Sequence, residues 1–75
     1  MHGAAVKALA IVLALCAVAA ADDRKAAERY FRAGEKAYQA QSFEAAARNF
    51  EEAYKGAPLP EIAFSAAQAY RRQYR

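Results

Sequence analysis

The sequence has little of what catalysis requires. Its 75 residues include no tryptophan, one histidine and one cysteine, and the last two, His2 and Cys16, stand near the amino terminus. Further along, Ser42 and Ser65 are the hydroxyl nucleophile candidates other than tyrosine, and neither has a suitable general base nearby in sequence. Glycine-rich phosphate loops and sets of metal-ligating residues are also missing. We therefore predict that the chain is not an enzyme and holds no cofactor or metal.

A strong excess of charge is absent as well. The formal net charge is +3. Removing Lys7 with the amino-terminal segment leaves 10 basic and 8 acidic residues, and Arg71, Arg72 and Arg75 account for that excess of two. Because nucleic-acid binders carry a basic stripe across one face, whereas arginines at one helix end complement the helix dipole, we expect no nucleic-acid partner.

The long apolar run needed to cross a membrane is missing too. Residues 8–21 form an uncharged stretch of 14 residues between Lys7 and two aspartates. At about 1.5 Å per residue, such a helix spans roughly 21 Å, less than the ~30 Å hydrocarbon core. The layout is that of a secretory signal peptide over residues 1–21, with cleavage after Ala20 or Ala21. The prediction is a secreted or periplasmic protein of the bacterial cell envelope, without stable membrane insertion after cleavage.

Cys16 raises one alternative for this segment. Bacterial lipoproteins place a small residue before the lipidated cysteine, whereas Leu15 stands there in this chain. Ordinary cleavage is therefore favoured over lipidation, with Cys16 as apolar filler in the hydrophobic run. The mature chain then contains no thiol and no disulfide.

What the chain does contain is helical periodicity. Apolar residues at steps of three and four predict a helix over 43–55 with one buried stripe, namely Phe43, Ala46, Ala47, Phe50, Ala53 and Tyr54. Ser42 suits the N-cap, and Gly56 in a left-handed conformation would close the helix. Two acid-before-base pairs four residues apart, Glu44 with Arg48 and Glu51 with Lys55, are predicted on its exposed face.

The same spacing recurs on both sides of this helix. Asp22 and Asp23 suit the cap of a preceding helix whose apolar positions are Ala27, Tyr30, Phe31, Gly34, Ala37 and Tyr38. A connection of about three residues, Ala40 to Ser42, predicts an antiparallel hairpin. Pro60 suits the first turn of a third helix with apolar positions Ala63, Ala66, Ala67, Tyr70 and Tyr74. The predicted fold is all-α: a helix-turn-helix hairpin and a third helix, preceded by a signal-peptide helix.

Small residues at the facing positions predict close packing. With Gly34 on the first helix and Ala46 on the second, the two backbones can approach closely. Phe50 and Ala53 would then form a knob and a hollow for the third helix.

Residues 27–60 resemble a complete tetratricopeptide repeat, and residues 61–75 resemble the first helix of a second one. The residues that carry the resemblance, and the packing roles it implies, are Tyr30, Gly34, Ala46, Phe50, Ala53 and Pro58. Ala37 and Gln41 depart from the pattern, at positions where the family has tyrosine and the turn glycine. The period from Gly34 to Ala67 is 33, one short of the usual 34.

The resemblance implies a module for binding proteins. In tetratricopeptide arrays, the first helices of successive repeats line a concave groove that holds a partner segment. The groove-facing residues here would be Phe31, Glu35, Tyr38, Gln39, Phe64, Gln68, Arg71 and Arg72. This mixture predicts a peptide partner with an aromatic or aliphatic anchor and an acidic group that reaches Arg71 or Arg72.

The size of the mature segment is informative. Residues 22–75 amount to 54 residues, whereas repeat proteins usually need about three stacked units. We expect an incomplete chain that continues past Arg75, or self-association through the uncovered third helix. Two other functions stay open: a spacer at the amino-terminal end of a larger envelope protein, and an amphipathic helical peptide on the membrane surface. The second is disfavoured because the apolar face is rich in alanine.

Overall fold

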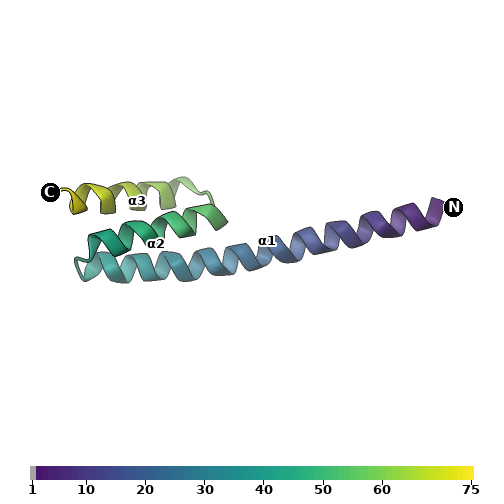
Figure 1. Ribbon diagram of the computed structural model, residues 1–75, viewed down its shortest axis with the longest axis horizontal. Helices are drawn as coiled ribbons and strands as arrows, with labels where there is room; N and C mark the ends of the chain where they lie inside the picture. The colour runs from purple at the N-terminus through teal and green to yellow at the C-terminus, as the bar shows by residue number, and fades with distance from the viewer. Residues whose placement is uncertain (1) are drawn as a thin grey trace.

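The chain folds into three helices and, over the residues described, no strand. The computed structural model describes the backbone from residue 2 to residue 75 and the side chains from residue 21 onward. Its helices are α1 (His2–Gln39), α2 (Phe43–Gly56) and α3 (Pro60–Gln73). Figure 1 shows α2 between α1 and α3, with consecutive helices running in opposite directions. The predicted all-α class is therefore confirmed.

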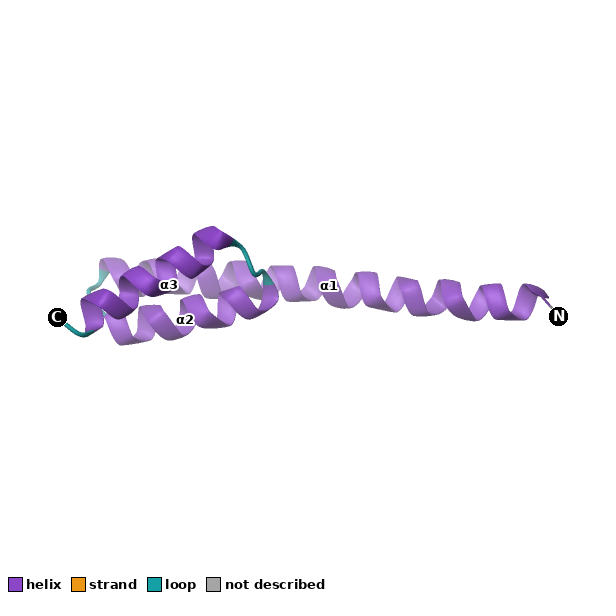
Figure 2. Ribbon diagram, turned by 90° about the horizontal axis from the view of Figure 1, so that it is seen from above, coloured by secondary structure: helices purple, strands orange, loops and turns teal. Residues whose placement is uncertain are grey.

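Helix α1 is longer than the sequence pattern predicts. A separate helix was expected to start at Asp22 and Asp23, but α1 continues through both residues without a break. The physical reason is composition: the segment between Gly3 and Gly34 contains no glycine or proline and is rich in alanine, the strongest helix former. In Figure 2 the amino-terminal part of α1 extends beyond the ends of α2 and α3.

The side chains of residues 1–20 lie outside the described residues. The predicted signal peptide, including Cys16, falls almost entirely within this segment. In the part of the chain that the structure does describe, no helix combines the length and the apolar character needed to cross a membrane.

Helix α2 is the centre of the fold. Its buried residues are Ala46, Ala47, Phe50 and Ala53, four members of the predicted stripe. The ends of that stripe differ, because Phe43 is half-buried and Tyr54 is exposed. Ser42 is the N-cap residue, but its hydroxyl makes no capping bond. Its backbone carbonyl instead accepts a hydrogen bond from the amide of Ala46 at 2.9 Å, so backbone geometry alone starts the helix.

The helix connection predicted at residues 40–42 is confirmed, and Gln41 is its unusual residue. Gln41 has a φ of 63°, in the left-handed region that glycine adopts most easily. The turn is closed by hydrogen bonds from the Gln41 amide to the Tyr38 carbonyl and from the Ser42 amide to the Ala37 carbonyl, at 3.0 and 2.8 Å. Glutamine thus bears a conformational strain at the position where the tetratricopeptide pattern has glycine.

Gly56 serves a different purpose from the predicted one. It was expected to close α2 in a left-handed conformation, but no glycine of the described chain has a positive φ. A Cβ atom placed on Gly56 would lie 2.6 Å from the backbone oxygen of Asp23 and 3.2 Å from the Cβ of Ala27. Glycine is therefore needed because the end of α2 approaches the backbone of α1 closely.

Gly34 also marks a close approach, and the atoms nearest to it belong to Phe50. A Cβ atom on Gly34 would lie 2.7 Å from two ring carbons of Phe50, Cδ1 and Cε1. The Phe50 ring packs at a tilt against Phe31, with 5.4 Å between centroids. Phe50 also belongs to a buried cluster with Ala46, Ala47 and Ala69. The close approach at Gly34 therefore involves the Phe50 ring, and Phe50 contributes to both helix interfaces. The predicted contact between Gly34 and Ala46 stays a prediction.

Helix α3 turns a different face toward α2 than the pattern predicted. Its buried residues are Ile62 and Ala69, with Ala66 and Tyr70 packed partly against the core. Three predicted stripe positions, Ala63, Ala67 and Tyr74, are exposed. The spacing of alanines left the face ambiguous, because alanine occurs on nearly every side of this helix. Burial follows the position of α2, the one helix on which α3 packs extensively.

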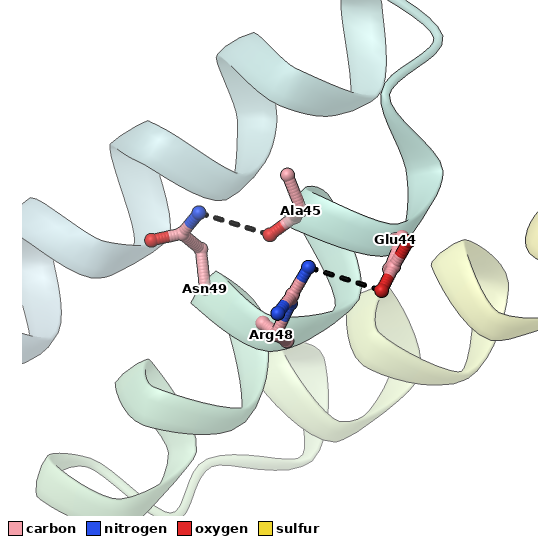
Figure 3. Close-up of polar contacts among 4 residues, drawn as sticks. All are labelled: Glu44, Ala45, Arg48 and Asn49. Atoms are coloured by element: carbon pink, nitrogen blue, oxygen red, sulfur yellow. Dashed lines mark hydrogen bonds and ion pairs between the residues drawn. The ribbon is translucent and has the colours of Figure 1, made fainter.

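The polar contacts on α2 confirm one predicted ion pair and correct the other. Arg48 Nη2 donates to Glu44 Oε1 at 3.0 Å, as predicted, and the Asn49 side-chain amide donates to the Ala45 carbonyl at 2.9 Å (Figure 3). Lys55 pairs with Glu52 at 2.8 Å and not with Glu51. Glu51 instead accepts a hydrogen bond from the Tyr70 hydroxyl. This bond ties α3 to α2.

Candidate functional site

The candidate site is a groove between α1 and α3. Both helices pack on α2, but they scarcely contact each other, so a channel with α2 at its base remains between them. Two hollows occupy it, and both are lined by Phe31 and Glu35, which places them end to end. We call the two hollows together the α1–α3 groove.

The first hollow is largely aromatic. It has a volume of about 370 Å³ and is lined by Phe31, Glu35, Tyr38, Gln39, Phe50, Phe64, Ser65 and Gln68. Phe64 is 64% exposed, a high value for a phenylalanine, whereas Phe50 at the base is buried. We call this the aromatic hollow.

The second hollow lies beside the connection between α2 and α3. It has a volume of about 810 Å³ and is lined by Asp23, Arg24, Ala27, Glu28, Phe31, Arg32, Glu35, Gly56, Ala57, Pro58, Leu59, Glu61 and Ile62. Leu59, between two prolines, is 52% exposed. We call this the loop hollow.

The structure brings together most of the residues predicted to face a partner. Six of the eight line the aromatic hollow, and they come from two helices separated in sequence by α2: Phe31, Glu35, Tyr38, Gln39, Phe64 and Gln68. Their convergence follows from the antiparallel path of the chain, because α1 and α3 run in the same direction and both pack on α2. Their role in binding stays a prediction.

The two predicted arginines do not line the groove. The guanidinium carbon of Arg72 lies 4.9 Å from the centroid of the Phe43 ring, in cation–π geometry. Tyr38 packs edge-on against the same Phe43 ring, with 5.1 Å between the two centroids. Arg71 is exposed and lines neither hollow. The acidic anchor predicted from these arginines therefore has no counterpart within the groove.

The residues expected to pack the repeat fall into two groups. Gly34, Ala46, Phe50 and Ala53 are buried. Tyr30 differs from expectation because it is 41% exposed, while the small residues Ala27 and Gly34 occupy the buried face of α1. Pro58 is exposed and lines the loop hollow.

Sequence reasoning missed most of the loop hollow. Leu59 and Ile62 lie on it, and so do the carboxylates Glu28 and Glu61. The two prolines around Leu59 were a signal for part of it. Because proline interrupts a helix, a leucine between two prolines is expected in the connection between α2 and α3 and not inside either helix. No sequence pattern indicated the charged residues of this lining, because they come from two separate elements, α1 and the start of α3.

The groove's charge is mainly negative. Four carboxylates line it, Asp23, Glu28, Glu35 and Glu61, against the two arginines Arg24 and Arg32. Among the side chains described, the ion pairs join Arg48 to Glu44 and Lys55 to Glu52, both outside the groove. The lining carboxylates and arginines are therefore free of ion-pair partners within the described part of the chain.

The chemistry available in the groove is that of apolar contact and hydrogen bonding. Ser65 is the hydroxyl in its lining other than tyrosine, and its Oγ donates to the backbone carbonyl of Glu61 at 3.0 Å. Among the described residues, no group of three or more histidine, cysteine, aspartate or glutamate side chains is placed to hold a metal ion. The groove side chains thus offer surface recognition: exposed rings, amide groups and free carboxylates.

No family model, no curated protein and no solved structure matches this chain.

Proposed function

We propose that the chain is an exported, tetratricopeptide-like module that binds a peptide segment of another protein in the α1–α3 groove. The observation that carries this proposal is the convergence of six predicted partner-facing residues, from two separate helices, on one hollow. The resemblance to tetratricopeptide repeats implied those residues before the fold was considered. If α1 and α3 are the first helices of successive repeats, the groove between them corresponds to the partner-binding groove of tetratricopeptide arrays, which supports the proposal.

The dimensions and the lining of the groove support peptide binding. Ligand sites in proteins are typically ~300–1,000 Å³ in volume, and both hollows fall within that range. Aromatic residues held in place around a hollow contribute most of the energy in many interfaces. Phe64 and Leu59 remain well exposed on this surface, which leaves apolar area for a partner to cover.

Export is part of the same proposal. Residues 1–21 would be removed as a signal peptide, leaving the chain to begin near Asp22. The contact of Gly56 with the backbone of Asp23, and the buried position of Ala27, fall after this point, so the described packing of α1 on α2 would be retained. Mass spectrometry of the exported protein is expected to give an amino terminus at Ala21 or Asp22, and retention of Met1 would refute cleavage.

Peptide selection tests the binding function. A random peptide library displayed on phage would be selected against the full chain, and enriched sequences would be synthesised for titration. We expect enriched peptides to lose most of their affinity for Phe64→Ala, because this ring lines the aromatic hollow and is exposed. Truncation of such an anchor typically costs at least about 2 kcal/mol, or roughly thirtyfold in affinity.

Tyr54→Ala is the matched control. Tyr54 is also an exposed aromatic residue, at 42%, but it lies on α2 and lines neither hollow. Its truncation is expected to leave the affinity unchanged. Failure to enrich any peptide, or equal losses in the two variants, would contradict the proposed function.

A further inference from the structure

We infer that the partner segment is basic: apolar side chains alternate with lysine or arginine, and the cationic groups reach Glu35 and Glu61. This inference rests on the proposed function and adds the chemistry of the partner. It also reverses the sign of the charge expected from Arg71 and Arg72, which line neither hollow.

The first step concerns the aromatic hollow. Glu35 is its one charged side chain among the described residues, and it stands where this hollow joins the loop hollow. It has no ion-pair partner among the described side chains, whose two ion pairs both lie on α2. A peptide that covered this hollow without a cation would remove water from an unpaired carboxylate, which is costly.

The second step extends the argument to the loop hollow. Glu61 lines it from α3, whereas Glu28 and Glu35 line it from α1, two helical turns apart on one face. Carboxylates thus stand on both walls of the groove. Arg24 and Arg32 also line this hollow, so positive charges are present, but the four carboxylates outnumber them and the net charge of the lining is negative.

The third step is the fit of a long cationic side chain. Phe31, Leu59 and Ile62 provide apolar surface between the carboxylates of the two walls. Lysine and arginine place their aliphatic stems on such surface and keep the charged group at its edge. An acidic segment would instead set like charges against four carboxylates, Asp23, Glu28, Glu35 and Glu61, with two arginines in the lining to offset them.

The length of the groove sets the length of the segment. Its lining on α1 runs from Asp23 to Gln39, which at about 1.5 Å per residue corresponds to roughly 24 Å. An extended peptide of about seven residues, at ~3.3 Å each, spans this distance. A short linear segment is therefore enough to contact both hollows.

Three labelled synthetic peptides test the inference on the full chain. They share leucine and phenylalanine at alternate positions of a seven-residue core and differ in the intervening residues, which are lysine, serine or glutamate. By fluorescence anisotropy, we expect the lysine peptide to bind about tenfold more tightly than the serine peptide, and the glutamate peptide to bind most weakly. Raising the salt concentration is expected to reduce the advantage of lysine.

Variants of the groove assign the effect to residues. Glu35→Gln and Glu61→Gln are expected to remove most of the advantage of lysine over serine. Glu44→Gln and Glu52→Gln are the controls, because these carboxylates lie on α2 outside both hollows, and they are expected to preserve it. Circular dichroism of each variant establishes that the helices are retained.

The outcomes separate the two proposals. If the lysine and serine peptides bind equally, and both are lost in Phe64→Ala, the groove binds peptides but the inference about charge is overturned. If none of the three binds and selection on phage also fails, the proposed function fails with it. If sedimentation shows that the chain self-associates, and Phe64→Ala abolishes this, the groove is occupied by a second copy and the basic-peptide inference is overturned.

Discussion

Helices α1 and α3 carry the same spacing of small residues, yet the structure treats them differently. Gly34 on α1 lies directly beneath the Phe50 ring and is buried. Ala67, at the corresponding position of α3, is exposed. The difference lies in the neighbour, because α2 covers this face of α1 while α3 meets α2 through Ile62 and Ala69. Small residues at similar spacing thus become core or surface according to what packs on them.

The two interfaces of α2 also differ in their chemistry. Toward α1, glycine permits close contact at two points: Gly34 meets Phe50 in the middle of α2, and Gly56 at the end of α2 meets the backbone of Asp23. Toward α3, a buried isoleucine is accompanied by the hydrogen bond from Tyr70 to Glu51. Phe50 contributes to both interfaces, so its truncation is expected to weaken both of them.

Phe50→Ala is expected to have the largest effect. Truncating a buried phenylalanine typically costs about 3–5 kcal/mol, and a unit of this size has only a few kcal/mol of total stability at ~0.05–0.15 kcal/mol per residue. We expect loss of cooperative unfolding, followed by circular dichroism during urea titration. Phe64→Ala is the control, because that ring is mostly exposed and its removal should change the stability by less than about 0.5 kcal/mol. Similar losses in both variants would contradict the assignment of Phe50 to the core.

Gly34→Ala tests the close approach of α1 and α2. The added methyl group would meet the Phe50 ring at 2.7 Å, and overpacking of this kind costs about 1–3 kcal/mol. This cost is expected to exceed the roughly 1 kcal/mol that alanine gains over glycine in helix propensity. The free energy of unfolding should therefore fall.

Ala67→Gly sharpens that comparison on α3. The position is exposed, so only helix propensity should count, and a loss of about 1 kcal/mol is expected. In α1, by contrast, glycine is the stabilising residue. A preference for glycine at position 34 and for alanine at position 67 would establish the difference between the two helices. A gain in stability from Gly34→Ala would contradict it.

Gln41→Gly concerns the connection between α1 and α2. Gln41 has a φ of 63°, which costs non-glycine residues about 1–2 kcal/mol, whereas glycine loses more conformational freedom on folding. We expect a net gain of up to about 1 kcal/mol in urea titration. Gln39→Gly, within the last turn of α1, should instead reduce the stability. Equal losses from both substitutions would argue against a left-handed residue at position 41.

The smallest expected effect concerns the bond between α2 and α3. The hydrogen bond to Glu51, with smaller contributions from desolvation and the Glu51 charge, raises the pKa of Tyr70 above its ordinary value of 10.0. The neutral phenol is therefore favoured in the folded chain. Its stabilising contribution is fully present below the unfolded pKa of about 10 and is lost as the pH rises through the higher folded value.

Absorbance titration of the phenolate tests this shift. Glu51→Ala should bring the pKa of Tyr70 down toward 10.0, because the acceptor and its charge are both removed. Glu52→Ala is the control, since Glu52 pairs with Lys55 and not with Tyr70. An unchanged titration in Glu51→Ala would show that this bond does not form in solution.

Several features followed from local sequence. For α2, the flanking residues predicted the start and, to within one residue, the end. Its six-residue apolar stripe included the four residues that are buried, because one face of a 3.6-residue period was apolar and the other charged. The three-residue connection before α2, at residues 40–42, was also predicted from the sequence. For α3, alanines on several sides left the buried face undetermined, and the stripe predicted there was displaced from Ile62 and Ala69.

The groove was predictable only in part. The tetratricopeptide resemblance implied six of the side chains that line the aromatic hollow, and the structure brings these six together. The charge of the lining was not predictable, because Glu61 and Glu28 come from different helices and line the same hollow only once the chain has folded back twice. Arg72 was assigned to the groove, whereas its contact with Phe43 depends on how α3 crosses the start of α2.

By itself, the amino-acid order determined where helices form and that α2 has one apolar face, because both depend on residues within a few positions of each other. Tertiary structure alone decided that Gly34 meets Phe50, that Gly56 meets the backbone of Asp23, and that carboxylates from α1 and α3 line one hollow. These contacts join residues far apart in the chain. Small side chains permit many helix–helix approaches, and only the packed arrangement selects one of them.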